Sequence, residues 1–453
     1  MRSKTAKQPY LSLSRESSLQ IVNEYRERYR AVDALLRRNP DLLDRVHHRL
    51  SRFLSTSRKG RRSTYTSDQI LRALLVMFLE GDSYRDVVVR IEESDFLREF
   101  VGLGWQSMMD FTFLSRAFGV LGETLWRDLN TTLAVDALLQ GKISGEQLRV
   151  DTTAVETAIH YPTESSLLWD GYRMLARLLR LARGEMRRPL SFRLHDTKVK
   201  RLALTIARSA RSRKKSTRRR MKRAYRTLLD RVRRVVELAE AVAARLEPLF
   251  SVRDELLHFA ALTRRVIQQT ETRVFEGRHL PASEKVYSVF EPHTELIKRG
   301  KAGKPVESGH KVFLGQTKEK FVSQYQVMPR QIDDTDLVDG LLAEHEALFD
   351  RLPSLLTADK GFYESMDKIA QLEEDIPVVS IAKKGKRDAA QSAREGDDLF
   401  KAGQRFRAGI EGSISVLKRA FKLSRCLFKG FRNYASAVGC AIFCYNLIVL
   451  TRL

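Results

Sequence analysis

The stretch SLLTADKGFY, residues 354–363, passes from a short apolar run directly to an aspartate, Asp359. The run SLLTA predicts a buried strand, and Gly361 permits a tight turn from this strand into a helix. A second stretch, QLRVDTTAV at 147–155, is rich in β-branched residues and predicts a strand that ends near Asp151. Because open α/β sheets place their functional sites at the carboxyl ends of strands, we expect both aspartates at one edge of a sheet.

From residue 284 onward the chain has the pattern of an α/β domain. Short apolar or β-branched runs predict strands, and apolar positions at a spacing of three and four predict helices. The expected strands are 285–290, 310–315, 321–327, 354–358 and 377–382; the expected helices are 333–349, 363–374, 405–423 and 433–450, with a polar linker at 383–399. The helix at 405–423 carries a further carboxylate, Glu411, within RFRAGIEGSISVLKRAF.

The sequence pattern before the first predicted strand is typical of helices. Apolar spacing predicts a helix at 17–55, and a basic linker separates it from the residues that follow. A second helix is expected at 68–80, and Ser83 with Asp86 forms a capping-box pattern that opens the next one. Short helices joined by tight turns fit a DNA-reading helix-turn-helix module, which we favour slightly, and they also fit a plain helical bundle.

Helical periodicity returns at 164–283, between the first predicted strand and the rest of the α/β part. This segment contains the most basic stretch of the chain, RSARSRKKSTRRRMKRAYR at 208–226. Such a run is commonly a solvated helix face or a loop. Here it lacks acidic residues and leads directly into an amphipathic helix, so we predict a surface that contacts phosphates. The residues expected to form it are Arg213, Lys214, Lys215, Arg218, Arg219 and Arg220.

The composition favours a folded protein that binds a polyanion. The 453 residues include 81 Lys+Arg against 56 Asp+Glu, a net charge of +25, and 43% hydrophobic residues. That hydrophobic share is enough for real cores and excludes global disorder. A large positive excess on a folded chain favours nucleic acid as the partner, although a basic structural or ribosome-associated protein has the same composition.

The cysteines and the apolar segments point to a cytoplasmic protein. Cys426, Cys440 and Cys444 lack the paired spacing of zinc ligands and fit reduced cysteines of a cytosolic chain. The N-terminus lacks the apolar region of a signal peptide. The most apolar stretch, 435–450, is too short to cross a membrane comfortably, so it predicts a buried helix and no membrane partner.

Asp151, Asp359 and Glu411 come from separated segments and could converge on hard divalent cations such as Mg²⁺ or Mn²⁺. Two such ions, about 4 Å apart, activate the attacking oxygen and stabilise the leaving oxygen in phosphoryl transfer. A basic protein that holds DNA phosphates beside carboxylates needs such cations to offset the repulsion. Composition alone does not select these three from 56 acidic residues, and each of them taken singly fits a helix cap or a surface charge.

These motifs together resemble the DDE transposases of bacterial insertion sequences, and among them the ISNCY group. That superfamily surrounds its catalytic glutamate with the pattern Tyr-x2-Arg-x3-Glu-x6-Lys. Arg407, Glu411 and Lys418 match its last three positions, whereas Gln404 replaces the tyrosine. The string DKGFY from Asp359 also resembles the second-aspartate motif of the family, in which a basic residue, glycine and an aromatic follow the aspartate.

The resemblance implies a catalytic domain of the ribonuclease-H-like type, interrupted by a helical insertion. The implied organisation is an N-terminal helical segment at 1–60, a helical and possibly DNA-binding region at 61–145, the catalytic domain at 146–163 with 284–453, and a basic insertion at 164–283. It also implies that Arg407, Lys418 and Lys360 contact DNA. His293 and His310 are candidates for the substrate side, with a structural role in turns at least as plausible.

The implied activity is DNA transposition with two Mg²⁺ or Mn²⁺ ions held by Asp151, Asp359 and Glu411. Metal-activated water nicks the ends of the insertion sequence, and the freed 3′-OH attacks target DNA. The expected partner is double-stranded DNA, terminal inverted repeats and target alike, and holding both ends together requires at least a homodimer. Two alternatives remain: a ribonuclease-H-like nuclease without strand transfer, and a DNA-binding protein derived from a transposase.

Overall fold

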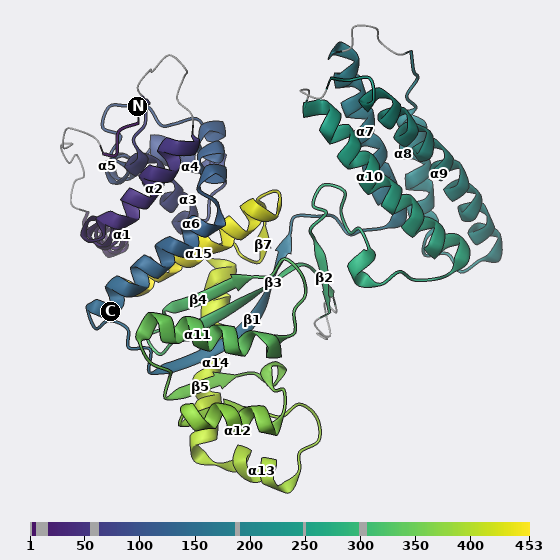
Figure 1. Cartoon of the computed structure of the whole chain (residues 1–453). Coiled ribbons are helices and arrows are strands. Elements are labelled where there is room, and N and C mark those ends of the chain that lie inside the picture. The colour runs from purple at the N-terminus through teal and green to yellow at the C-terminus, as the bar shows by residue number, and fades with distance from the viewer. Residues whose placement is uncertain (1, 6–16, 55–62, 186–190, 248–250, 299–305) are drawn as a thin grey trace. The chain divides into compact units, whose positions relative to one another are not determined.

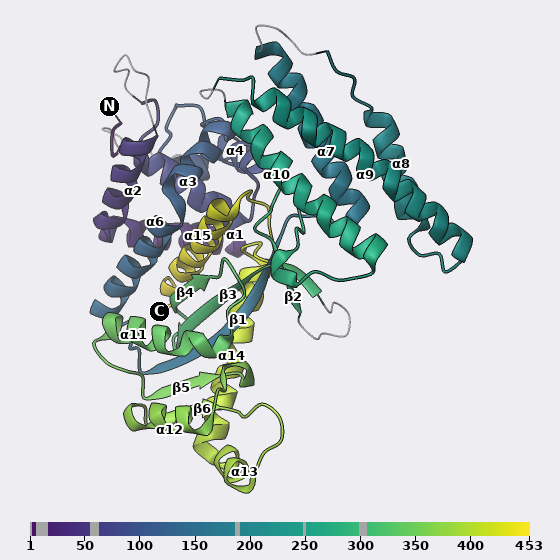
Figure 2. The ribbon, with the colours of Figure 1, turned by 45° about the vertical axis from the view of Figure 1, so that its right-hand side comes forward.

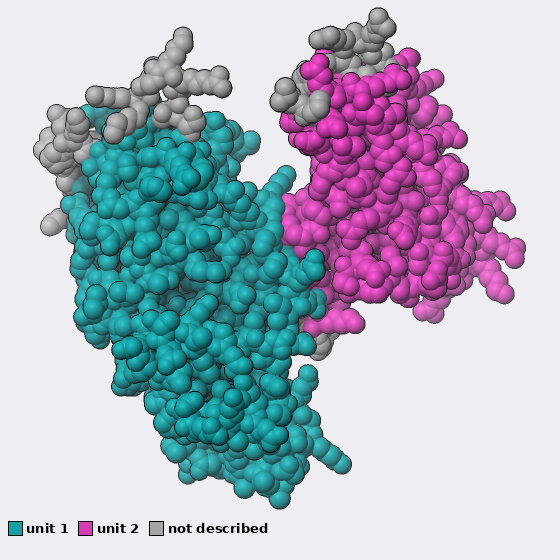
Figure 3. All heavy atoms as spheres, in the orientation of Figure 1, with its two compact units in different colours: residues 1–156, 310–453 teal, residues 157–309 magenta. Residues whose placement is uncertain are grey.

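The computed structural model of the chain describes residues 2–5, 17–54, 63–185, 191–247, 251–298 and 306–453. They form helices and a mixed sheet, so the expected combination of α and α/β regions is confirmed. The chain divides into two units (Figure 3): unit 1 comprises residues 1–156 with 310–453, and unit 2 comprises residues 157–309. Each unit has its own hydrophobic core.

The sheet has the strand order β2–β3–β1–β5–β6, with β4 paired to β3 and β7 paired to β1 (Figure 1). β1, β5 and β6 run parallel, whereas β3 is antiparallel to β2 and to β4. The strands are β1 (Gln147–Thr157), β2 (Glu295–Lys298), β3 (Val306–Thr317), β4 (Val322–Val327), β5 (Leu355–Ala358), β6 (Val378–Ile381) and β7 (Arg425–Cys426).

The two faces of β1 and β5 are covered by different helices. Apolar side chains on one face pack with α11 (Val338–Phe349) and α12 (Met366–Asp375), namely Leu148, Val150, Leu356 and Ala358. Side chains of the alternate positions reach α14 (Asp398–Arg419) on the other face. There Arg149 donates to Phe406 O at 3.1 Å, and the Thr357 hydroxyl donates to Gly403 O at 3.2 Å.

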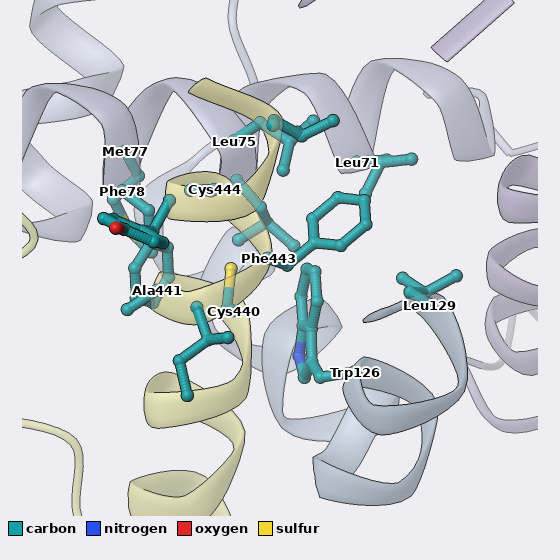
Figure 4. Packing of buried hydrophobic residues seen from close by; sticks show 14 of the residues in the cluster. Leu71, Leu75, Met77, Phe78, Trp126, Leu129, Cys440, Ala441, Phe443 and Cys444 are labelled. Atoms are coloured by element: carbon teal, nitrogen blue, oxygen red, sulfur yellow. The ribbon is translucent and has the colours of Figure 1, made fainter. Parts of the chain in front are cut away.

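The N-terminal helices share one core with the C-terminal helix α15 (Phe431–Leu450). That helix packs against α3 (Ser67–Glu80) and α6 (Phe111–Leu139), and the ring centres of Trp126 and Phe443 lie 6.0 Å apart in this contact (Figure 4). Cys440 and Cys444 are buried there, as core packing predicts. The helices are α1 (Gln20–Arg38), α2 (Pro40–Phe53), α3 (Ser67–Glu80), α4 (Tyr84–Glu92), α5 (Asp95–Val101) and α6 (Phe111–Leu139).

α15 is the one helix of the described chain that is long and apolar enough to cross a membrane, and 83% of its most apolar window is buried inside the protein. Its outer positions are therefore occupied by protein rather than left for lipid. The interpretation of 435–450 as a buried helix is confirmed, since all but a few residues of α15 lie in the core.

Four sequence-based element predictions are wrong. The strand expected to end near Asp151 continues to Thr157, because its second half has a distant partner in β7, where Glu156 N–H donates to Ser424 O. The helix expected at 17–55 is two helices, because Pro40 lacks an N–H and forces Asn39 out of helical geometry. The strand expected at 285–290 is absent, because the Gln269 side chain rather than a neighbouring strand bonds the backbone of Val286. The linker expected at 383–399 contains α13 (Ala389–Gly396), which a capping box of Asp388 and Gln391 opens.

Unit 2 is built around four helices (Figure 2), which enclose a core of leucine, valine and alanine side chains. They are α7 (Glu164–Glu185), α8 (Asp196–Ser209), α9 (Lys215–Ala243) and α10 (Ser251–Glu271). The predicted helical segment at 164–283 is confirmed, and α8 is a helix within it that no apolar spacing singled out. β2 and the adjoining ends of β1 and β3 complete the unit.

Candidate active site

Asp151 and Asp359 lie side by side on neighbouring parallel strands. Arg149 of β1 is paired with Thr357 of β5, so two residues further along each chain Asp151 is level with Asp359. Each aspartate accepts a backbone hydrogen bond at 2.7 Å, Asp151 from Thr152 N–H and Asp359 from Gly361 N–H. Alternation along the strands directs both carboxylates to the face that α14 covers. The expectation that the two aspartates lie next to each other on the sheet is therefore confirmed, and their binding of a metal ion stays a prediction.

Glu411 is connected to Asp151 through Arg407. Both residues lie on α14, four positions apart, and Arg407 Nη2 is 3.1 Å from Glu411 Oε1. Arg407 Nη1 is also 3.7 Å from Asp151 Oδ2. The side chain of Glu411 is 65% exposed, whereas those of Asp151 and Arg407 are 15% and 19% exposed. One guanidinium thus links the carboxylate of β1 to the carboxylate of α14.

Two glycines bring α14 close to the sheet. A β-carbon on Gly403 would lie 2.5 Å from the β-carbon of Ser380, and one on Gly409 would collide with the Arg149 guanidinium. Gln404, at the position where the resembled family has tyrosine, donates to Ser380 O at 2.6 Å and to Ala358 O at 3.3 Å. The hydrogen bonds of its amide group connect α14 to the ends of β5 and β6, so Gln404 has a structural role.

Arg149 supplies a buried positive charge on the α14 face, two residues before Asp151. It is 4% exposed, its Nε donates to Gln316 Oε1 at 2.8 Å, and its guanidinium lies 4.7 Å from the ring centre of Phe406. Burial lowers the pKa of Arg149 from its ordinary value. A cation on this face offsets part of the repulsion between the carboxylates.

Asp334 is a fourth carboxylate at this edge of the sheet, and the sequence interpretation missed it. The Thr152 hydroxyl donates to Asp334 Oδ2 at 3.3 Å, and Lys311 Nζ lies 3.1 Å from Asp334 Oδ1. Asp334 Oδ2 and Asp359 Oδ1 lie 3.1 Å and 2.8 Å from the point where a Gly361 β-carbon would be. The available sequence signal is the acidic run at 333–336, which stands at the start of the predicted helix 333–349, where acidic residues are common.

The other predicted residues of the α/β part have mixed outcomes. Lys360 is exposed directly after Asp359, and Lys418 is partly exposed two turns along α14 from Glu411. His310 is fully buried, its ring 5.0 Å from that of Phe431, and it bonds Met328 O at 2.9 Å. A role for His310 on the substrate side is therefore wrong. His293 pairs with Glu291 at 2.8 Å in a turn, as the structural alternative predicts.

The basic stretch of unit 2 forms an exposed turn and the beginning of α9. The predicted residues Arg213, Lys214, Lys215, Arg218, Arg219 and Arg220 are all exposed. Lys214 is the N-cap residue, its side chain makes no capping hydrogen bond, and the first turn contains no acidic residue. Cations at the positive end of a helix oppose its dipole, so this sequence is locally unfavourable for the helix.

The carboxylates have the oxygen donors that Mg²⁺ and Mn²⁺ prefer, and Asp151 with Asp359 is the pair that the sheet holds together. Within the described ranges, no three His, Cys, Asp or Glu side chains are grouped closely enough to hold a metal ion in their present positions. Glu411 is 65% exposed and pairs with Arg407. Comparisons of the chain with protein-family models, with curated proteins and with solved structures found no match.

Proposed function

We propose that this chain is a DDE-type transposase, an enzyme that cuts DNA at the ends of an insertion sequence and joins the cut strands to target DNA. One observation carries the proposal. Asp151 and Asp359 are level with each other on neighbouring parallel strands, and Arg407 links Asp151 to Glu411 on the helix that covers them. These contacts support a shared site for residues from three distant parts of the sequence.

The order of elements supports a ribonuclease-H-like catalytic domain. The resembled family has a strand with the first aspartate, two strands, a helix, a strand with the second aspartate, a helix, a strand and a helix with the glutamate. The chain has β1, β3, β4, α11, β5, α12, β6 and α14 in this order. The departures are β2 and the helices of unit 2, which follow β1, and α13, which precedes α14.

In this proposal Asp151, Asp359 and Glu411 hold divalent ions, Mg²⁺ or Mn²⁺, and the ions supply activation of water and stabilisation of the leaving oxygen. Arg407 balances the carboxylate charge before DNA arrives. Lys360, exposed beside Asp359, and Lys418, further along α14, contact phosphates on the two sides of the scissile bond. Asp334 positions Thr152 and Lys311 next to the aspartates.

The exposed cations of unit 2 support double-stranded DNA as the partner. The start of α9 places Arg218, Arg219 and Arg220 in its first two turns, where they weaken the helix but attract an anion. Residues that reduce local stability at an exposed position are expected where a polyanion binds. Joining two transposon ends requires two chains, so we propose a homodimer or larger assembly on DNA.

The catalytic assignment is tested by Asp359→Asn, Asp151→Asn and Glu411→Gln, with Asp375→Asn as the control because that carboxylate is exposed at the end of α12. The substrate is a supercoiled plasmid that carries the DNA flanking the gene, with Mg²⁺ or Mn²⁺. Each site variant should nick it at least about a hundredfold more slowly, because metal-held charge stabilisation amounts to several kcal/mol. DNA binding should be retained. Normal nicking by Asp359→Asn would refute the assignment.

A strand-transfer assay separates the proposal from a nuclease without joining activity. A duplex with a free 3′-OH at the proposed transposon end should be joined to a target plasmid by the wild-type chain and by Asp375→Asn. Cleavage without any joined product would instead support a ribonuclease-H-like nuclease. If the chain binds DNA but neither cuts nor joins it, it is a DNA-binding protein.

The role of unit 2 is tested by replacing Arg218, Arg219 and Arg220 together with glutamate. Binding to duplex DNA should weaken, and the slope of log affinity against log salt should become shallower by about one unit for each lost phosphate contact. Because these side chains are exposed, the unfolding temperature should not fall. Unchanged affinity and slope would remove this stretch from the DNA-binding surface.

A further inference from the structure

Unit 1 has a groove of about 910 Å³ between the turn that joins α3 to α4 and the segment 418–430, which comprises the end of α14 and its connection to α15. This volume lies within the range of ligand sites, about 300–1,000 Å³. The segment contains β7, which pairs with β1, and Glu156 N–H donates to Ser424 O at 3.2 Å. The groove is therefore built partly from the helix that carries Glu411 and partly beside the strand that carries Asp151.

The inner surface of the groove is aromatic and aliphatic. The ring of Phe428 stacks on that of Phe78 at 5.7 Å and meets that of Tyr84 edge-on at 5.6 Å. Phe428 and Tyr84 are partly exposed, and Leu427 beside them is 70% exposed. Single exposed leucines are ordinary, but an exposed leucine next to partly open rings within a groove forms an apolar floor.

The rim of the groove is positively charged. Its lining includes five cations from one short segment, Lys418, Arg419, Lys422, Arg425 and Lys429. The two carboxylates of the lining are already engaged: Asp82 pairs with Arg90 at 2.5 Å, and Asp86 caps α4 together with Ser83. Charge complementarity therefore favours an anionic occupant.

Lys422 is held in place at this rim. It has a left-handed backbone, φ 58°, and its side chain packs over Gly81, where a β-carbon would lie 2.8 Å from Lys422 Cε. A non-glycine residue in this conformation is uncommon and persists where the surrounding structure fixes it. The aliphatic part of its side chain thus lies over the turn between α3 and α4.

We infer that this groove binds unpaired nucleotides of a DNA strand, with bases on the floor of Phe428, Tyr84 and Leu427 and phosphates on the rim cations. An aromatic floor with a cationic rim is the usual form of a single-strand site. In a duplex the bases are stacked inside, so a paired partner would leave the floor unused. The inference rests on the proposed function only in taking DNA as the polymer.

The position of the groove relative to the carboxylates fits this occupant. Lys418 follows Glu411 by seven residues on one helix, which corresponds to about 10 Å along its axis. Successive phosphates of one B-form strand rise by about 3.4 Å, so the rim begins roughly three nucleotides from the carboxylates. Nucleotides next to the cut would therefore be unpaired when the strand is processed.

The test compares two duplexes that differ only in a three-nucleotide single-stranded extension, and it is made with the full chain and without divalent metal. 2-Aminopurine in the extension reports stacking, and fluorescence anisotropy reports affinity. The wild-type chain should bind the extended duplex about tenfold more tightly than the blunt one, because each stacked base contributes substantially to affinity. It should also quench 2-aminopurine.

Three variants probe the groove. Leu427→Ser removes an exposed part of the floor, Phe428→Ala removes its ring, and the double change Arg419→Glu with Lys429→Glu reverses two exposed rim charges. Each should reduce the preference for the extended duplex to less than about threefold. Leu427→Ser keeps the test valid if Phe428→Ala fails to fold. The control is Lys318→Glu, an exposed lysine in the turn between β3 and β4, which should keep the preference.

Two results overturn the inference. One is equal affinity of the wild-type chain for both duplexes, and the other is an unchanged preference in Leu427→Ser and in the double charge variant. If those variants instead change the oligomeric state measured by light scattering and keep the preference, the groove is an interface between copies. These outcomes leave the Asp359-dependent cleavage untouched, whereas a chain that binds neither duplex contradicts the proposed function itself.

Discussion

Among single residues, Arg407 is the one whose contacts connect the candidate site. Its guanidinium is 3.1 Å from Glu411 and 3.7 Å from Asp151, where a divalent cation is also expected to bind. Two positive groups compete for the same carboxylates, and a unit charge at about 4 Å changes the energy by about 1 kcal/mol even in water. In the proposed site, Arg407 should therefore balance the carboxylate charge before a metal ion binds and weaken the binding of that ion.

Arg407→Ala should bind Mn²⁺ roughly fivefold more tightly than the wild-type chain, because the competing cation is gone. Titration calorimetry without DNA measures this directly. Arg407→Lys keeps the charge and should have close to wild-type affinity for the ion. In the same variants, cleavage of DNA should fall with Arg407→Ala, because the residue is also a proposed phosphate contact. Weaker ion binding by Arg407→Ala would mean that Arg407 organises the carboxylates rather than competes for them.

Asp334 is expected to act as a positioning residue. It accepts from Thr152 and pairs with Lys311, and residues that orient metal-bound carboxylates typically contribute about 10- to 100-fold to metal affinity or activity. Asp334→Asn should lower both by such a factor while duplex binding is kept. Asp336→Asn, exposed in the same short helix, is the matched control. A purely structural role predicts a lower unfolding temperature with unchanged Mn²⁺ affinity.

Among elements, α14 is the one that the site depends on most, because it carries Arg407 and Glu411 and approaches the sheet through glycines. Local propensity argues against glycine inside a helix, at a cost of about 1 kcal/mol each relative to alanine. Gly409 has a packing reason, since a β-carbon there would collide with the Arg149 guanidinium. Gly412 has nothing within 4 Å of that position. We therefore expect replacement by alanine to change the stability of unit 1 in opposite directions at Gly409 and at Gly412.

Gly409→Ala should destabilise unit 1 by about 1–3 kcal/mol, because the added carbon overfills a packed contact. Gly412→Ala should stabilise it by up to about 1 kcal/mol through helix propensity. Urea unfolding of both variants gives the comparison. Cleavage should fall in Gly409→Ala, since a displaced α14 moves Arg407 and Glu411 away from Asp151. Equal effects of the two changes would show that α14 does not pack on Arg149 in solution.

For the whole molecule, the stability of unit 1 should depend on pH through His345. This residue of α11 is fully buried and its Nε2–H donates to Gly145 O at 2.9 Å. Burial lowers the pKa of His345 to about 4, against roughly 6.5 in an unfolded chain. Between these values the unfolded chain binds a proton and the folded one does not, so the unfolding free energy falls as the pH falls from about 6.5 to 4.

The loss from this one group amounts to about 3 kcal/mol. His345→Gln keeps a donor for Gly145 O but does not titrate, so its unfolding free energy should fall less steeply over the same pH range. The exposed His48→Gln is the control and should behave like the wild-type chain. Chemical unfolding at a series of pH values measures the slopes. Identical slopes for all three chains would assign the acid sensitivity to other groups.

The sequence by itself determined the features that depend on neighbours a few positions away. Local patterns predicted a strand through Asp151, a strand that stops just before Asp359, the capping box of Ser83, and the spacing of Arg407 with Glu411, because caps, turns and helix faces are set by residues up to four positions apart. The predicted end of the first strand near Asp151 is wrong, because pairing with the distant β7 is part of a strand that continues to Thr157. The capping box of Asp388 and Gln391 is also a local pattern, and it predicts the helix α13 that the expected linker did not include.

Tertiary structure decided what depends on residues far apart in the chain. The pairing of β1 with β5 makes Asp151 level with Asp359, the fold brings Asp334 to Thr152 across 182 positions, and α15 joins the N-terminal helices in one core. The backbone of Val286, which has the sequence of a strand, is bonded instead by a distant glutamine side chain. Such contacts result from packing and pairing over the whole chain, and no local spacing encodes them.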